Sequence, residues 1–199
     1  MDIENIKKKI SDISDTIIEN KEYLTELDRQ IGDADHGYNM AKGFTAVKII
    51  LEDDFKSVKE LINKIAMTLI SNVGGASGPL YGSFFMKFAQ GLDDSDNINK
   101  KQFADAFSKG LDGVIMRGKA QINDKTMVDV LEPVSKALYE DKPYSEIVKL
   151  AKEKMEDTKE MKARKGRASY LGDRSIGHID PGACSSYLMI ETLMGDLDG

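Results

Sequence analysis

Apolar residues recur at steps of three and four positions along most of the chain, which is the spacing of one face of an α-helix. Near the N-terminus five isoleucines follow this spacing, and lysines and aspartates fall outside their stripe. These residues are Ile3, Ile6, Ile10, Ile13 and Ile17. The pattern predicts an amphipathic first helix that buries its isoleucine face.

The same period returns in later segments, and each predicts a further helix. These segments are residues 40–51, 58–69, 81–88, 103–115, 127–138, 147–155 and the stretch after Asp180-Pro181. Ser57 and Glu60 have the spacing of a capping box ahead of the 58–69 stripe, and Pro79 suits a first helical turn. Strand-like alternation is not sustained anywhere, so the sequence predicts an all-α bundle of about eight helices.

Two segments qualify this picture. Pro133 lies inside the predicted helix over 127–138, where its ring removes a backbone donor and presses on the preceding turn. It therefore predicts a kink or a later helix start. The Lys- and Glu-rich residues 152–165 predict a solvated helix face. Because no shift in composition marks a boundary, we expect one helical domain over residues 1–199.

Composition excludes several classes of protein. The 199 residues carry 28 Lys and Arg against 34 Asp and Glu, a net charge of −6, so we expect no nucleic-acid binding. No apolar run reaches the length of a membrane span, and Asp2 and Glu4 stand where a secretory signal is basic. We therefore expect a cytoplasmic protein without a membrane partner. The single Cys184 excludes an intramolecular disulfide framework and a multi-cysteine zinc site.

Glycines gather in a few places beside acids, hydroxyls and histidines, and the first cluster spans residues 27–39. Asp28, Asp33 and Asp35 lie there next to His36. Three carboxylates facing one point need a cation, and oxygen ligands without cysteine suggest Mg²⁺, Mn²⁺ or Ca²⁺. An EF-hand is excluded because the sixth and twelfth positions counted from Asp33 are Tyr38 and Phe44. The alternative, that these aspartates only cap helices and form turns, stays open.

The second cluster, residues 73–82, runs directly into the aromatic segment that begins at Pro79. Glycine-freed backbone donors and a helix N-terminus would converge there, which outlines an anion site. No Gly-Lys-Ser/Thr follows, so it is not a Walker A loop. Close packing of helices explains these glycines equally well.

Two later clusters, residues 117–127 and 164–182, mix cations with glycine as phosphate recognition requires. The second of them leads into a helix at Pro181 with Asp180 at the N-cap, and capping alone would also explain Asp180. His36 and His178 are the two histidines of the chain and both lie in these glycine-bearing clusters. Their placement favours a role at a site over a purely structural one.

Taken together, four motifs in order along the chain resemble the nucleotide-binding L subunit of the phosphotransferase-linked dihydroxyacetone kinases. They are residues 32–37 (GDADHG), 74–79 (GGASGP), 124–129 (DKTMVD), and 166–170 (GRASY) with 180–182 (DPG). The resemblance implies an eight-helix antiparallel barrel-like bundle, with ADP or ATP and two Mg²⁺ ions held in the loops at one end. Asn123 stands where many relatives are expected to have glycine, and asparagine tolerates the left-handed conformation that such a turn needs.

The resemblance also implies roles for particular residues. Asp28, Asp33 and Asp35 would ligate the paired Mg²⁺ ions. The nucleotide would contact His36, Gly37, Tyr38, Asn39, Ala76, Ser77, Gly118, Met127, Arg167, Asp180, Pro181 and Gly182. Of these, Ala76 and Ser77 would cradle the phosphates, and Gly118 and Met127 would border the adenine. No side chain is expected to act as a nucleophile, because phosphoryl transfer needs mainly positioning and electrostatic stabilisation.

In the relatives linked to the phosphotransferase system, bound ADP receives a phosphoryl group from a phosphohistidine on an M subunit. It passes that group to dihydroxyacetone on a K subunit. We expect both subunits as partners, with Arg174 and His178 on the rim where partners dock. One alternative is an ATP-dependent dihydroxyacetone kinase or fatty-acid-kinase-like domain. Another is a non-catalytic, nucleotide-bound adaptor of a transcriptional regulator.

Overall fold

The computed structural model of the chain describes residues 1–195 and 197, and within them it contains nine α-helices and two short 3₁₀ segments. The α-helices are α1 (Ile3–Glu19), α2 (Lys21–Ile31), α3 (His36–Ile50), α4 (Val58–Asn72), α5 (Ser77–Gln90), α6 (Lys100–Gly118), α7 (Val128–Tyr139), α8 (Tyr144–Asp157) and α9 (Pro181–Met194). The 3₁₀ segments are η1 (Thr158–Glu160) and η2 (Arg167–Ser175). The described residues form no strand, which confirms the predicted all-α class.

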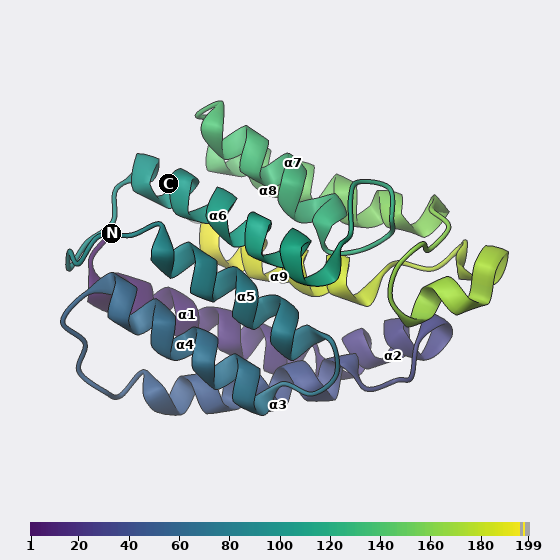
Figure 1. Cartoon of the computed structure of the whole chain (residues 1–199), viewed down its shortest axis with the longest axis horizontal. Coiled ribbons are helices and arrows are strands. Elements are labelled where there is room, and N and C mark those ends of the chain that lie inside the picture. Colours follow the sequence, from purple (N-terminus) through teal and green to yellow (C-terminus); the bar gives the residue numbers. More distant parts are fainter. Residues whose placement is uncertain (196, 198–199) are drawn as a thin grey trace.

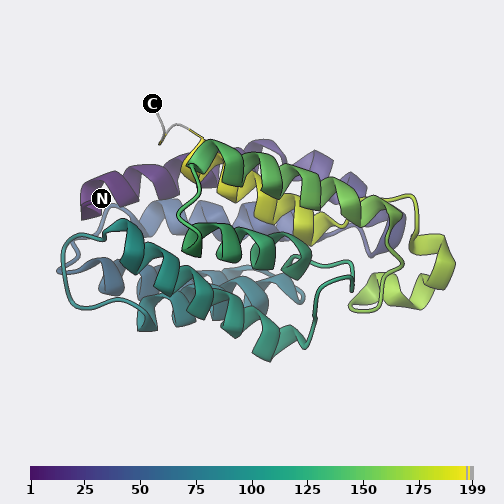
Figure 2. The ribbon, with the colours of Figure 1, turned by 90° about the horizontal axis from the view of Figure 1, so that it is seen from above.

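The helices close into a ring. Helix α1 packs on α3, each of α3 to α8 packs on the next long helix, and α9 packs back on α1. Connections alternate between the two ends of the molecule, so neighbours in the ring run antiparallel (Figures 1 and 2). Helix α2 follows α1 after Asn20 alone, and with these two counted together the ring has the eight members of the predicted barrel.

Hydrophobic burial holds this ring together. Ile6, Ile10, Ile13 and Ile17 are buried in the core, as the first stripe predicts. On the other side, phenylalanines of α5 and α6 stack edge to face, with Phe84 and Phe107 centroids 5.2 Å apart. An apolar cavity of about 100 Å³ lies between α1, α5 and α9, and its lining extends to Met1. In the described part of the chain, no helix is both long and apolar enough to cross a membrane.

Helix ends follow the predicted signals with small differences. Ser57 Oγ accepts the N–H of Glu60 at 3.1 Å, but Glu60 accepts from the N–H of Lys56 instead of that of Ser57. Asp180 caps α9 by accepting the N–H of Ala183 at 2.8 Å. Helix α7 begins at Val128 and continues through Pro133, so the predicted late start is wrong. A helix of this core is stabilised by packing on its neighbours, which outweighs one lost backbone hydrogen bond.

Two segments differ from the sequence prediction. Helix α2 is absent from the predicted helices, and it extends to Ile31, so that only residues 32–35 of the 27–39 cluster lie between helices. Residues 152–165 are not one solvated helix face, because α8 ends at Asp157 and both Thr158 and Ala163 are buried. After α8, residues 158–180 lie at the end of the barrel away from the N-terminus (Figure 1). We name these residues the closing segment.

Candidate functional site

Four connections between helices lie at one end of the barrel and surround a cavity of about 640 Å³. They are the α2–α3, α4–α5, α6–α7 and α8–α9 connections. Each contains one of the glycine clusters seen in the sequence, and each contributes residues to the lining. The size is within the range of pockets that bind small molecules and cofactors.

One side of the cavity is acidic. Asp28, in the last turn of α2, lies beside Asp33 and Asp35, and oxygens of the three carboxylates lie within 4.8 Å of one another. We name these three residues the carboxylate cluster. Asp28 Oδ2 also accepts the N–H groups of Asp35 at 2.9 Å and of His36 at 3.1 Å, so it holds the N-terminus of α3. A side chain at Gly32 would collide with the Asp28 carboxylate.

The electrostatics of this side favour a bound cation. Burial raises the pKa of the Asp35 carboxyl, and the nearby Asp33 and Asp28 raise it further. Arg167 Nη2 lies 3.0 Å from Asp33 Oδ2, but the arginine side chain is 70% exposed. One exposed guanidinium offsets only part of three close negative charges. A set of carboxylate oxygens with no sulfur ligand fits Mg²⁺ or another hard divalent cation.

The α4–α5 connection forms a second side that fits an anion. Gly75 has φ +65°, which favours glycine, and a side chain at Gly74 would displace the Asn39 amide group. Helix α5 begins directly after it at Ser77, and no acidic residue lies in its first turn. The first N–H groups of a helix have no intrahelical partner, and together with the helix dipole they attract phosphate.

His36 lies under this turn in a buried hydrogen-bonded network. Its Nδ1 is 3.0 Å from Ser77 Oγ and its Nε2 is 2.9 Å from Ser185 Oγ. Ser185 Oγ lies 2.7 Å from the hydroxyl of Tyr81, which lies 2.9 Å from Ser186 Oγ. Burial lowers the pKa of the His36 imidazole to about 4, so this ring is neutral at pH 7 and both its nitrogens have partners.

A third side is apolar and comes mainly from α5, α6 and the α6–α7 connection. We name it the apolar wall, and it consists of Leu80, Val114, Ala120, Met127 and Val128. Gly118 lies beside it at the end of α6, where an added Cβ would press against the Leu80 side chain. Such a surface suits the face of an aromatic base. The acidic and apolar sides of the cavity therefore offer different chemistry to the two ends of one ligand.

The closing segment and the start of α9 complete the enclosure. Lys165, Gly166, Arg167 and Ala168 line the cavity from η2 and the residues before it. Asp180, Pro181 and Gly182 line it from the start of α9. Asp180 therefore both caps a helix and faces the cavity. Burial raises the pKa of the Asp180 carboxyl to about 7, although the Ala183 N–H and the nearby Lys125 favour its charged form.

The residues assigned to metal or nucleotide from the sequence all line the cavity, except Gly37, Tyr38 and Asn39. These three follow His36 in the chain and lie next to the lining. Gly37 is buried against the carbonyl of Lys21 and allows α3 to pack on α2. Tyr38 is 55% exposed. Asn39 makes a side-chain hydrogen bond with Asp35.

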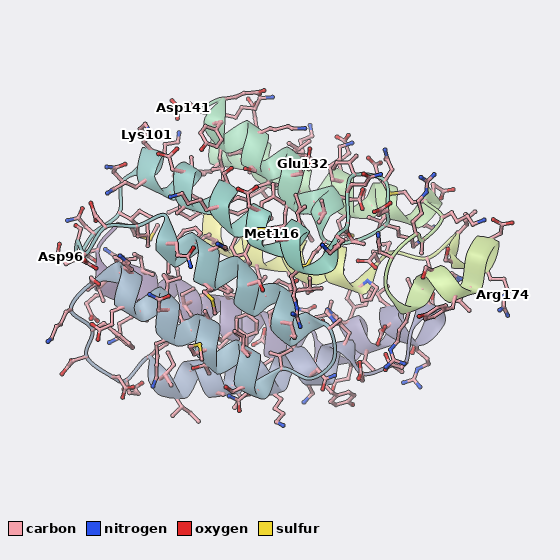
Figure 3. The ribbon with its side chains drawn as sticks, viewed as in Figure 1. Asp96, Lys101, Met116, Glu132, Asp141 and Arg174 are labelled. Carbon is pink, nitrogen blue, oxygen red and sulfur yellow. The ribbon has the colours of Figure 1, made fainter. Side chains whose placement is uncertain are left out.

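The two residues expected on the rim also lie outside the lining. The His178 ring hydrogen-bonds to Gln30 through Nδ1. Arg174 is exposed and lies at the outer end of the molecule (Figure 3).

Several lining residues were missed by the sequence analysis. Lys125 belongs to a motif that carried the family resemblance, but nothing in its spacing reveals that its side chain is buried. The apolar wall was recognised only at Met127, because Leu80 and Val114 belong to helical stripes that also fill the core. Ser185 lies outside the lining but holds His36, and it was also missed because its helix carries no signal for a polar contact.

Comparison with known proteins gives close matches. The DAK2 domain family matches residues 30–195. The chain is 42% identical over 186 residues to the ADP-binding subunit of PEP-dependent dihydroxyacetone kinase 1 of Listeria innocua, covering 93% of this chain and 92% of that protein. It is 47% identical over 182 residues to the ADP-binding subunit of the PEP-dependent dihydroxyacetone kinase of Escherichia coli, covering 86% of each.

A solved structure is also similar in fold. The dihydroxyacetone kinase from C. freundii in complex with AMP-PNP and Mg²⁺ superposes with a TM-score of 0.77 at 23% sequence identity. The match covers 95% of this chain and 33% of that one. The similarity extends to α1, which lies outside the residues matched by the family, and it establishes the barrel fold.

Proposed function

Because the chain belongs to the DAK2 domain family, we propose that it is the ADP-binding subunit of a phosphoenolpyruvate-dependent dihydroxyacetone kinase. In this role it is a phosphotransferase subunit. Its bound ADP receives a phosphoryl group from a phosphohistidine on an M subunit and donates it to dihydroxyacetone on a K subunit. Residues 1–199 act as one nucleotide-binding unit in this proposal.

The observation that carries the proposal is the arrangement of three chemically different sides around one cavity. The apolar wall suits adenine, the N-terminus of α5 suits phosphates, and the carboxylate cluster suits the metal that phosphates bring with them. A nucleoside diphosphate with a divalent cation has these parts in the same order. The base is then held inward near Met127 and Gly118, and the phosphates lie toward the α2–α3 connection.

Within this site, Asp28, Asp33 and Asp35 would hold two Mg²⁺ ions, and Arg167 would add positive charge beside Asp33. When bound, Mg²⁺ neutralises the charge on the phosphoryl group being transferred. The chain contributes position and electrostatics, not a covalent bond to phosphate. His36 supports this assignment, because both its ring nitrogens are hydrogen-bonded and it is buried below the cavity.

Partners need access to the terminal phosphate, since an in-line transfer aligns donor and acceptor oxygens with it. We therefore place both partner subunits at the end of the barrel that carries the four connections. Arg174 and His178 lie on the closing segment at this end and form the rim in the proposal. A positive rim attracts an acidic partner surface and speeds productive encounters.

The test begins with the purified protein, whose bound nucleotide is identified by mass spectrometry and ultraviolet absorption after dialysis. Retained ADP that is released by EDTA is the expected result. Adding phosphorylated M subunit, K subunit and dihydroxyacetone should then give dihydroxyacetone phosphate, and omitting either subunit should abolish it. The same assay with ATP as the only phosphoryl source is the control.

Three results would contradict the proposal in different ways. Turnover with free ATP and no M subunit would favour an ATP-dependent kinase. Retained ADP without transfer to any acceptor would favour a nucleotide-bound adaptor. If neither ADP nor ATP binds in the presence of Mg²⁺, the nucleotide assignment itself is wrong.

A further inference from the structure

Lys125 is a buried lysine whose ammonium group is surrounded by backbone carbonyl oxygens. Its side chain is 1% exposed. Nζ lies 2.8 Å from the carbonyl oxygens of Thr158 and Ser175 and 3.2 Å from that of Met161, and it also donates to the carbonyl of His178. An ammonium has three N–H donors, so this group is fully engaged by the four oxygens.

All four oxygens belong to the closing segment, whereas Lys125 belongs to the α6–α7 connection. The ammonium therefore joins two connections that are far apart in sequence. It gathers the start of the closing segment, at Thr158, and its last residues, near His178, around one positive charge. A structural metal ion with carbonyl ligands would hold a loop in the same way.

The local backbone adds a second reason to regard this contact as important. Lys125 has φ +63°, in the left-handed region that non-glycine residues rarely adopt. A buried charge is also costly unless it is fully hydrogen-bonded. Both costs are tolerated at a single residue, which indicates that the surrounding structure depends on it.

The closing segment has little apolar core of its own. Ala163 and Ala168 are buried with Ile31 of α2 in a small cluster apart from the main core, and Ile179 at the end of the segment packs against the main core. The other contacts that define it are hydrogen bonds and exposed ion pairs, such as the N–H of Ala163 to Ser175 Oγ at 2.9 Å and the N–H of Arg164 to the Asp124 carbonyl at 3.1 Å. Hydrophobic burial therefore contributes less to the stability of the closing segment than to that of the long helices of the barrel.

Lys125 is not placed to bind phosphate itself. Its ammonium is already surrounded by four carbonyl oxygens of the closing segment, so a phosphate oxygen would have to displace one of them. Its position suits an indirect role, in which the shape of the closing segment fixes Arg167 beside Asp33 at the edge of the cavity.

We propose that Lys125 is a positioning residue that sets how long nucleotide stays bound, because its ammonium holds the closing segment across the cavity. This inference rests on the proposed function, since it takes a nucleotide as the ligand. Loss of the ammonium frees the closing segment, so release of ADP becomes faster while the barrel remains folded.

The experiment compares Lys125→Met with wild type and with Lys162→Met. Lys162 is a matched control, because it lies in the same segment but pairs with Asp173 in an exposed contact at 2.8 Å. Release of a fluorescent ADP analogue bound with Mg²⁺ is followed after dilution into excess ADP. We expect Lys125→Met to release it about tenfold faster or more, since charge-assisted hydrogen bonds are the strong ones, and Lys162→Met to match wild type.

Limited trypsin digestion provides a second readout, because Arg164, Lys165 and Arg167 are cleavage sites within the closing segment. Cleavage there should become faster in Lys125→Met, while helix content by circular dichroism stays close to wild type. A purely structural role predicts something else. If Lys125 only stabilised the fold, Lys125→Met would lower the fraction of molecules that bind the ADP analogue and would leave the release rate of the molecules that still bind unchanged.

A milder variant keeps the test decisive if Lys125→Met does not fold. Ser175→Ala removes the hydroxyl that accepts from Ala163 and donates to the Gly172 carbonyl at 2.7 Å, and should speed release about threefold. If release and cleavage match wild type in every variant that folds, the inference is overturned. If wild type itself does not bind the analogue with Mg²⁺, the proposed function fails instead.

Discussion

The body of the barrel and its open end are built on different physical principles. The body consists of long helices that bury stripes of Ile, Leu, Val and Phe around one core. The open end consists of short connections whose shape depends on carboxylates, glycines and the buried Lys125. The body also contains an apolar cavity of about 100 Å³, whereas the open end has a larger cavity whose lining includes charged and polar groups.

This difference predicts that the free energy of unfolding depends mainly on the body, whereas ligand binding depends mainly on the open end. Burial of apolar side chains is insensitive to pH and to divalent cations, so the body should stay folded when ligands are removed. The open end combines like charges, left-handed residues and a segment with little core of its own. It should therefore respond to metal, nucleotide and pH while the body does not. The following substitutions test that separation.

The largest expected effect is on the body. Phe44 is 0% exposed in α3, and Phe44→Ala should lower the free energy of unfolding by about 3–5 kcal/mol. Chemical denaturation of the ligand-free protein measures this loss. Affinity for ADP with Mg²⁺, corrected for the folded fraction, should stay near wild type. A large loss of affinity in the folded molecules would show that the two regions are not separate.

The second effect contrasts two members of the carboxylate cluster. Asp33→Ala and Asp28→Ala should each weaken binding of ADP with Mg²⁺ by about 100-fold, because the cation loses an anionic ligand. Asp28→Ala should also lower the free energy of unfolding by about 1–2 kcal/mol, because it holds the N-terminus of α3. Isothermal titration and denaturation measure the two quantities.

The control for this pair is Asp112→Ala on α6, an exposed aspartate that is absent from the cavity lining. It should change neither quantity. Wild-type affinity in both cluster variants would remove the metal assignment, whatever their stability.

A third effect depends on pH. The folded-state pKa of Asp180 is raised to about 7, so the folded state holds this proton more tightly than the unfolded state. The resulting stabilisation is complete below pH 4 and is lost as pH rises through 7. In the ligand-free protein, wild type should therefore lose about 2 kcal/mol relative to Asp180→Asn between pH 5 and pH 8. A constant difference between the two proteins across this range would contradict the raised pKa.

The smallest effect concerns partners. Arg174→Glu should slow phosphoryl transfer between subunits about 3- to 10-fold and leave ADP affinity near wild type, because Arg174 is outside the cavity lining and we propose that it contacts partners. The effect should shrink as salt is raised. Lys101→Glu, at the opposite end of the barrel, is the matched control and should change neither (Figure 3). Equal loss of transfer and ADP affinity in Arg174→Glu would place that residue in the nucleotide site.

Much of the body could be predicted from the sequence, because the period of apolar residues directly reflects which face a helix buries. The stripe from Ile3 to Ile17 became α1, and Asp180 with Pro181 gave the start of α9. The family resemblance, drawn from four motifs, is confirmed, and so is the barrel that it implied. Helix α2 was missed because three aspartates near its end resembled a loop, although Leu24, Leu27 and Ile31 continue the period.

The open end was less predictable for a physical reason. Lys125 is held by backbone carbonyl groups, which every residue has, so no pattern of side chains in the sequence predicts this contact. The closing segment likewise follows no period, because its turns depend on left-handed glycines at Gly166, Gly172 and Gly177. The sequence could locate the chemistry of the site but not the contacts that hold it in shape.

Tyr81 has a further consequence, because this one side chain lines both the polar cavity and the apolar one. Its ring lies between the two cavities, and its hydroxyl group is held by Ser185 Oγ at 2.7 Å and Ser186 Oγ at 2.9 Å. The lining of the apolar cavity exposes no polar surface, so a water molecule there would lack the hydrogen-bond partners that it needs, whereas the cavity on the other side of Tyr81 offers many. A change in the position of the Tyr81 ring would therefore alter the shape of both cavities at once, and would link the packing of the body to the floor of the open end.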